Sequence, residues 1–319
     1  MTSRAVVFTF DEDARCLFGF RFALQRLRRF NRHMPVHVYL DGDITPISVL
    51  AAADPHLHVH EAKRMRHAMP SIAPPSFLKW HAVAELADQY DEVAYFDTDT
   101  FVFDDVDQLF DSAGDTKFAA RDFGGYWSNP PHKWGIVFAH EIPGYARKIE
   151  DLARLIGVTP MGHFNSGVMI FKQGFQREIA RHIPRLVNLL RTFTSGLLPN
   201  PLEKGQFWFA EEVCARFFVV MAGLKELSFL EPSVAPYYHE YATREVPGPG
   251  LVVHTWSAYF NVAVAEFGTR EEIDELMSLS LHPRSTHKSF RWLGFQQHIR
   301  NRFALDFRAR IARKLLLLN

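Results

Sequence analysis

The start of the chain places one amphipathic segment between two apolar runs, and this order limits the fold more than any other feature. Residues 5–10 (AVVFTF) and 36–40 (VHVYL) have the composition of buried strands. Between them, Phe20, Leu24 and Leu27 recur at helical spacing. A strand, a helix and a second strand form a crossover unit, and such units join parallel strands. We therefore expect an α/β protein with a central sheet flanked by helices.

The rest of the chain continues this alternation of strands and helices. Strands are expected at 57–60, 93–96, 100–103, 117–120, 164–171 and 251–254, and helices at 80–90, 145–156, 179–193, 211–221 and 269–279. No repeat and no clean linker divides the sequence, so we expect the second half to pack onto the same sheet as the first.

Composition excludes several classes of protein. Hydrophobic residues make up 47% of the 319 positions and the formal net charge is zero, which is typical of a globular protein without a global field that recruits nucleic acid. Two cysteines, Cys16 and Cys214, are too few for a disulfide framework and favour a reducing compartment. The first residues lack the apolar core of a signal peptide, and no apolar run is as long as a membrane span. We expect a cytoplasmic protein.

The segment YDEVAYFDTDTFVFDD, residues 90–105, carries the clearest chemical signal. A short strand is followed at once by Asp97 and Asp99, two carboxylates separated by Thr98. Carboxylates held this close repel each other unless a cation compensates their charge. Oxygen ligands suit Mg²⁺ or Mn²⁺, which commonly bridge to the phosphates of a substrate. Ligands of open α/β sheets also bind where strands end. The alternative is a solvated acidic turn.

The order of motifs resembles a known family. The series VVFTF-D, PVHVYLDGD, FLKW, YDEVAYFDTDT, FNSGVMIF, FAEEV and VVHTW, over residues 5–260, is similar to the GT-A fold glycosyltransferases. It looks most like glycosyltransferase family 8, the retaining group that includes glycogenin-like and bacterial lipopolysaccharide hexosyltransferases. The resemblance implies a GT-A, Rossmann-like mixed sheet flanked by helices. It also implies transfer of a hexose, glucose or galactose, from a UDP-sugar to a glycan or glycolipid, in polysaccharide or lipopolysaccharide biosynthesis.

The resemblance assigns a role to several residues. His254 in VVHTW matches the third metal ligand of the family, beside Asp97 and Asp99; a packed histidine at a strand end is the alternative. Lys79 in FLKW matches a cation that approaches the diphosphate or donor sugar, although a lone lysine on a helix is usually solvated. The residues matched to nucleotide and sugar contacts are Thr9, Phe10, Asp11, Thr98, Asn165, Ser166 and Gly167.

Three acidic residues match catalytic or donor-sugar positions of the family. Asp122 matches an acid that contacts the donor sugar. Glu211 stands where relatives often have Gln, and Glu212 stands where they have Asp. If Glu211 faces the anomeric carbon, a carboxylate nucleophile and retention become possible; the alternative is a solvent-facing helix start. The late His-x-Gly-x-x-Lys-Pro-Trp motif of many relatives is absent, so the lysine that usually grips the diphosphate is missing or comes from elsewhere.

The last thirty-odd residues have a different character. From Arg284 onward, nine lysines and arginines stand against one acid, Asp306. Apolar side chains recur every three or four residues, at Trp292, Phe295, Ile299, Phe303, Phe307, Ile311, Leu315 and Leu318. We expect a domain at 1–283, with a nucleotide-binding part at 1–105 and an acceptor and sugar part at 106–283, followed by a basic amphipathic helix at 284–319. That helix either binds an anionic membrane surface, which would make the protein peripheral on the cytoplasmic membrane, or docks on the domain or a second subunit.

Two other functions fit parts of the sequence. A phosphatase of the haloacid dehalogenase type also has Asp-x-Asp after a strand, but it needs the pair on the first strand and a Thr or Val where Phe101 stands. The second alternative is a carbohydrate- or membrane-binding relative that has lost turnover. The sequence leaves the sugar, the acceptor and the oligomeric state open.

Overall fold

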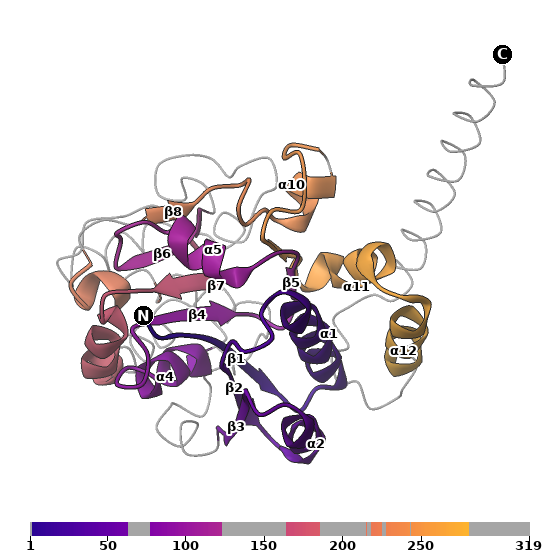
Figure 1. The fold of residues 1–319 in the computed structure, drawn as a ribbon, viewed down its shortest axis with the longest axis horizontal. Helices are drawn as coiled ribbons and strands as arrows, with labels where there is room; N and C mark the ends of the chain where they lie inside the picture. The colour runs from indigo at the N-terminus through magenta and orange to yellow at the C-terminus, as the bar shows by residue number, and fades with distance from the viewer. Residues whose placement is uncertain are drawn as a thin grey trace, which may run out of the picture. The chain divides into compact units, whose positions relative to one another are not determined.

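A seven-stranded sheet lies at the centre of the fold, in the order β3-β2-β1-β4-β7-β6-β8 (Figure 1). Neighbours among β3, β2, β1 and β4 are parallel, whereas β7 is antiparallel to both β4 and β6. The strands are β1 (Arg4–Asp11), β2 (Val36–Asp41), β3 (Leu57–Glu61), β4 (Glu92–Phe96), β6 (Phe118–Asp122), β7 (Phe164–Phe171) and β8 (Ser228–Leu230). The expected mixed sheet is confirmed, and strands from the second half of the chain do join it.

The computed structural model describes residues 2–62, 77–122, 164–185, 215, 218–224, 228–242 and 244–280. By its contacts the chain forms two compact units, residues 1–259 and 260–319. The boundary expected between 283 and 284 and the basic helix expected at 284–319 lie outside the described residues, as do the helix expected at 145–156 and most of the one at 211–221.

The helices begin and end at recognisable signals. The side chain of Asp13 accepts a hydrogen bond from the Arg15 backbone N–H and caps α1, and Asp105 caps α5 in the same way. The labelled helices are α1 (Ala14–Phe30), α2 (Thr45–Ala53), α4 (Leu78–Glu85), α5 (Val106–Ser112), α10 (Tyr238–Ala242), α11 (Trp256–Phe267) and α12 (Arg270–Ser280). Residues 175–185 are also helical. None of the helices in the described residues is long and apolar enough to cross a bilayer.

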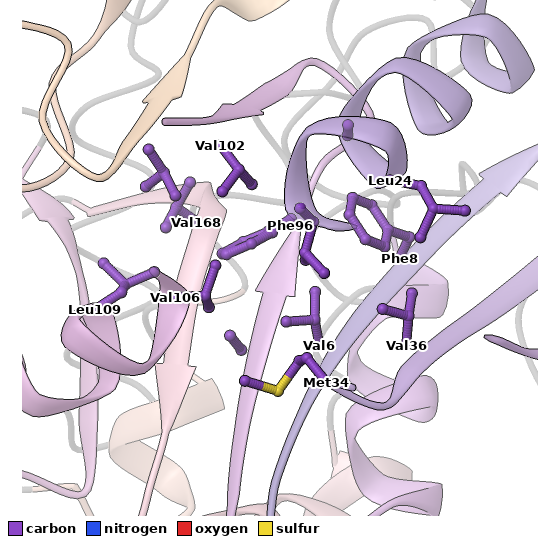
Figure 2. Packing of buried hydrophobic residues seen from close by; sticks show 14 of the residues in the cluster. Val6, Phe8, Leu24, Met34, Val36, Phe96, Val102, Val106, Leu109 and Val168 are labelled. Carbon is purple, nitrogen blue, oxygen red and sulfur yellow. The ribbon is translucent and has the colours of Figure 1, made fainter. Parts of the chain in front are cut away.

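Two hydrophobic cores cover the two faces of the sheet. On one face, Val6 and Phe8 of β1 and Phe96 of β4 pack with α1 and α5 (Figure 2). On the other face, Val7 and Tyr95, which alternate with those residues along the same strands, pack with α4. This alternation follows from the pleat of a strand that is covered on both sides. It also fixes which side chains of β4 face α4.

Candidate metal centre

The end of β4 lies beside the beginning of β7. Because the two strands are antiparallel, Phe96 is opposite Val168 and the backbone N–H of Asp97 donates to the Gly167 carbonyl at 2.8 Å. The backbone of Asp97 is therefore anchored directly after the end of β4. Its side chain is 34% exposed, so the carboxylate is accessible although its backbone is fixed.

A small second sheet brings His254 to the same place. Strands β5 (Thr100–Val102) and β9 (Val252–His254) pair antiparallel, with Thr100 opposite His254. The next residue, Thr255, donates to the Asp99 carbonyl from its backbone N–H at 3.0 Å and from its hydroxyl at 2.9 Å. Segments more than 150 residues apart in the sequence are thus joined beside the two carboxylates.

The three predicted ligands converge. His254 Nε2 lies 3.1 Å from Asp99 Oδ1 and 3.9 Å from Asp97 Oδ2. One ligand atom from each residue lies within 4.8 Å of the others. His254 is only 5% exposed, and its Nδ1 is buried without a hydrogen-bond partner among the described residues.

These residues fit a divalent cation. Ligand atoms bound to one octahedral ion at about 2.1 Å are separated by about 3–4 Å, which the two measured separations match. Two carboxylate oxygens and one imidazole nitrogen form a donor set suited to Mn²⁺ and compatible with Mg²⁺. Three protein ligands leave room for substrate oxygens and water. The solvated acidic turn and the merely packed histidine are both less consistent with this convergence.

Gly167 is required by the close approach of His254. A Cβ at this position would lie 2.2 Å from His254 Cε1 and 2.5 Å from Nε2, far inside van der Waals contact. The Gly167 carbonyl also holds Asp97, and its N–H donates to Asn165 Oδ1 at 2.8 Å. Absence of a side chain therefore lets β7 and His254 meet at the centre.

Lys79 is buried rather than solvated. The residue is 1% exposed, and its ammonium donates to the hydroxyl and the carbonyl of Ser166 at 3.0 and 3.2 Å. Its Nζ is 3.5 Å from Asp97 Oδ1 and 4.9 Å from the centre of the Tyr95 ring. Since a buried ammonium is costly without partners, these contacts fix its position beside the acidic pair.

The residues predicted to meet the nucleotide are placed by the ends of β1 and β4. Thr9 is buried and its hydroxyl is 3.2 Å from the Tyr95 hydroxyl. Phe10 is 3% exposed and its ring is 5.2 Å from that of Phe20, within the core. Asp11 accepts a hydrogen bond from the Asp13 N–H. The predicted nucleotide contacts of these residues and of Thr98 stay predictions.

The other predicted site residues fall into two groups. Asn165 and Ser166 are buried at the start of β7, close to Lys79 and Gly167. Asp122 is exposed at the end of β6, and its carbonyl accepts a hydrogen bond from the Tyr237 hydroxyl at 3.2 Å. Glu211 and Glu212 lie outside the described residues.

The sequence reasoning missed several residues that support the centre. Tyr95 donates from its hydroxyl to Asp97 Oδ1 at 2.5 Å. On the other side, the Tyr237 ring lies 6.2 Å from the His254 ring, and the guanidinium of buried Arg121 lies 4.9 Å from that tyrosine ring. Tyr95 could have been found, because it lies two residues before Asp97 and so on the same side of β4. The contacts of Tyr237 with His254 and Arg121 join separate segments of the chain, so no local sequence pattern predicts them.

Cys16 borders the same region. Burial raises the pKa of its thiol, and the carboxylates of Asp11, Asp13 and Asp99 raise it further. The thiolate is the form that binds metals and attacks electrophiles. Cys16 therefore stays a protonated thiol at neutral pH.

No protein-family model and no curated protein sequence matches the chain. Solved structures do match. The apo structure of WbbM, a bifunctional glycosyltransferase, aligns with a TM-score of 0.53 and 15% identity, over 86% of this chain and 51% of WbbM. The chain has a GT-A fold. It spans about half the length of that WbbM chain.

Two further glycosyltransferase structures align less well. The galactosyltransferase LgtC, solved with donor and acceptor sugar analogues, gives a TM-score of 0.48 at 14% identity, over 88% of this chain and 98% of LgtC. GlyE from Streptococcus pneumoniae gives 0.47 at 16% identity, over 88% of this chain and 61% of GlyE. The expected fold class is confirmed, and membership of glycosyltransferase family 8 stays a prediction.

Proposed function

We propose that this protein is a metal-dependent glycosyltransferase that moves a hexose, glucose or galactose, from a UDP-sugar to a glycan or glycolipid, with retention. The observation that carries the proposal is the convergence of Asp97, Asp99 and His254 at the end of β4 in a GT-A fold. Ligand sites of open α/β sheets lie at the carboxyl ends of strands, where this cluster lies.

Asp97, Asp99 and His254 would hold Mn²⁺ or Mg²⁺. When bound, the cation acts as a Lewis acid that stabilises negative charge on the diphosphate leaving group. Lys79 adds a fixed positive charge beside Asp97. Asn165 and Ser166 lie next to Lys79 and are proposed to orient donor or acceptor hydroxyls, and exposed Asp122 is proposed to contact the donor sugar.

The proposal of retention depends on Glu211 and Glu212. A carboxylate on the face of the sugar opposite the diphosphate can attack the anomeric carbon and expel the nucleoside diphosphate. An acceptor hydroxyl then displaces the carboxylate with a second inversion and gives its proton to the released diphosphate. We assign the nucleophile to Glu211 from the sequence pattern.

The basic segment 284–319 is proposed to hold the enzyme on an anionic membrane surface, close to a lipid-linked acceptor.

The decisive experiment measures sugar release from UDP-glucose and UDP-galactose by the full chain, with Mn²⁺ and with chelator. Asp99→Asn removes one ligand oxygen, and we expect at least about a hundredfold loss of Mn²⁺-dependent turnover, the loss expected when stabilisation of the leaving charge fails. The matched control is Asp104→Asn, because Asp104 is an exposed acid nearby that lies outside the cluster. We expect the control to retain full activity.

Three results would contradict the proposal. Equal turnover with Mn²⁺ and with chelator would remove the metal dependence. Hydrolysis of p-nitrophenyl phosphate without sugar release would favour the phosphatase, and neither activity would favour a binding protein. The Asp pair follows β4 rather than the first strand, which speaks against the phosphatase.

A further inference from the structure

The two oxygens of the Asp97 carboxylate have different surroundings. Oδ1 accepts the Tyr95 hydroxyl at 2.5 Å and lies 3.5 Å from Lys79 Nζ. Oδ2 is the oxygen that faces His254 Nε2, at 3.9 Å. One oxygen is therefore committed to protein donors, while the other points toward the proposed metal position.

Tyr95 is well placed to enforce this division. It is 1% exposed on the face of β4 that packs with α4, so its ring has little freedom to turn away. A phenol carries a single proton, and Tyr95 uses it for Asp97. The Thr9 hydroxyl, 3.2 Å from the Tyr95 oxygen, must then be the donor of that pair. Thr9 therefore donates a hydrogen bond to Tyr95, and Tyr95 donates one to Asp97.

Lys79 reinforces the same oxygen. Ser166 accepts two of the possible ammonium hydrogen bonds, and the Tyr95 ring lies under the charge at 4.9 Å. The ammonium is thus held on one side of Asp97 by groups from α4, β4 and β7. Because the ammonium lies 3.5 Å from Oδ1, it lowers the ability of that oxygen to serve a second cation.

We propose that Tyr95 and Lys79 are positioning residues that restrict Asp97 to one ligand oxygen, Oδ2, and thereby make the centre select small octahedral cations over Ca²⁺. This inference rests on the metal centre of the proposed function. Ca²⁺ takes six to eight oxygens and commonly binds both oxygens of a carboxylate, whereas Mg²⁺ accepts single oxygens in octahedral geometry. Holding Oδ1 away removes a ligand that Ca²⁺ needs more than Mn²⁺ does.

The test measures cation binding rather than turnover. Free Mn²⁺ is followed by its electron paramagnetic resonance signal in titrations of the full chain, and Ca²⁺ affinity is obtained by competition. For Tyr95→Phe, which keeps the ring and removes the hydroxyl, we expect about tenfold weaker Mn²⁺ binding, as for other residues that orient metal ligands. Because Oδ1 becomes available as a ligand, Ca²⁺ affinity should fall less than Mn²⁺ affinity. The ratio of Mn²⁺ to Ca²⁺ affinity should therefore fall about threefold or more.

The matched control is Tyr39→Phe. Tyr39 is also a buried tyrosine in the core beside α4, but its ring stacks on His60 rather than approaching the centre. We expect both affinities of the control to equal those of the wild type. Thr9→Val supplies a second variant if Tyr95→Phe does not fold, with an expected loss of about twofold in Mn²⁺ affinity from the missing donor.

The outcomes separate this inference from the function. If the wild type binds Mn²⁺ and both Tyr95→Phe and Thr9→Val leave the affinities and their ratio unchanged, the positioning role is wrong while the centre stands. If the wild type binds no Mn²⁺, the centre and the inference both fail. If the ratio shifts as expected but no UDP-sugar is consumed, the positioning role holds and the transferase proposal fails.

Discussion

Gly167 is the residue whose side chain the centre tolerates least. An added Cβ would overlap the His254 imidazole, with Nδ1 at 2.7 Å and Cε1 at 2.2 Å. Gly167→Ala should therefore push His254 away from Asp99, or force strands β7 and β9 to move apart. We expect a loss of about 2 kcal/mol in the free energy of unfolding, typical of overpacking, together with loss of Mn²⁺ binding. Urea denaturation and a Mn²⁺ titration measure the two effects.

Gly248→Ala is the control for that substitution. No atom lies within 4 Å of a Cβ built at Gly248, and its backbone φ is outside the left-handed range. The control should keep its stability and its metal affinity. A Gly167→Ala protein that binds Mn²⁺ as tightly as the wild type would show that His254 does not need its present position.

At the scale of single residues, the sequence predicted the metal ligands better than the residues that hold them in position. Asp97 and Asp99 stand two residues apart after an apolar strand, so their chemistry can be recognised locally. His254 was assigned by resemblance alone, and its convergence with the pair depends on the pairing of β5 with β9. Burial of Lys79 could not be predicted, because its partner Ser166 comes from a strand 87 residues away.

Histidines line the edge of the sheet where β3 pairs with β2. His37 Nδ1 lies 2.9 Å from His60 Nε2, and His37 Nε2 lies 2.9 Å from the Tyr90 hydroxyl. The His58 ring stacks on His37 at 4.6 Å. Burial, together with His58 and His60, lowers the pKa of His37 to about 3. The surroundings of His37 therefore favour its neutral imidazole.

This cluster predicts a dependence of stability on pH. The unfolded chain takes up a proton at His37 below its ordinary pKa of 6.5, whereas the folded chain does so only near 3. Stability is therefore fully present above pH 6.5 and is lost as the pH falls from 6.5 toward 3. Between pH 7 and pH 5 we expect His37 to account for about 1 kcal/mol, after allowance for solvent screening.

Urea denaturation at the two pH values tests the effect with His37→Phe, which keeps an aromatic ring but cannot titrate. The variant should lose about 1 kcal/mol less than the wild type on acidification. His182→Gln, in the helical residues 175–185, is the control and should behave as the wild type. An equal loss in His37→Phe and wild type would remove His37 as the cause.

The elements themselves were predicted unevenly. β1, α1 and β2 were found because their apolar residues follow clear periods and their burial matches, as Phe20 and Leu27 show. α2 was missed, because Ile47 is its only buried residue and no apolar stripe marks it. The direction of β7 could not be predicted, since a strand buried at every position reads alike in either direction.

For the molecule as a whole, the sheet explains why one site collects residues from so much of the chain. Crossovers among β1, β2, β3 and β4 align the carboxyl ends of four parallel strands. Antiparallel β7 then returns its beginning, with Asn165, Ser166 and Gly167, to the same edge. The centre thus needs both the pairing of β4 with β7 and the pairing of β5 with β9, which couples metal binding to folding.

Residues 284–319 are proposed to contact an anionic membrane surface. Each basic residue near an anionic surface contributes about 1 kcal/mol, so replacing Arg308, Arg310 and Arg313 by Gln should weaken binding to phosphatidylserine vesicles about a hundredfold at low salt. Cosedimentation of the full chain measures this. Replacing the exposed Arg181, Arg185 and Arg270 by Gln removes the same charge elsewhere and should change little. UDP-sugar hydrolysis should be equal in all three proteins. The tail would be ruled out as a membrane contact if the wild-type protein stayed in the supernatant at low salt. It would also be ruled out if the control bound as weakly as the tail variant.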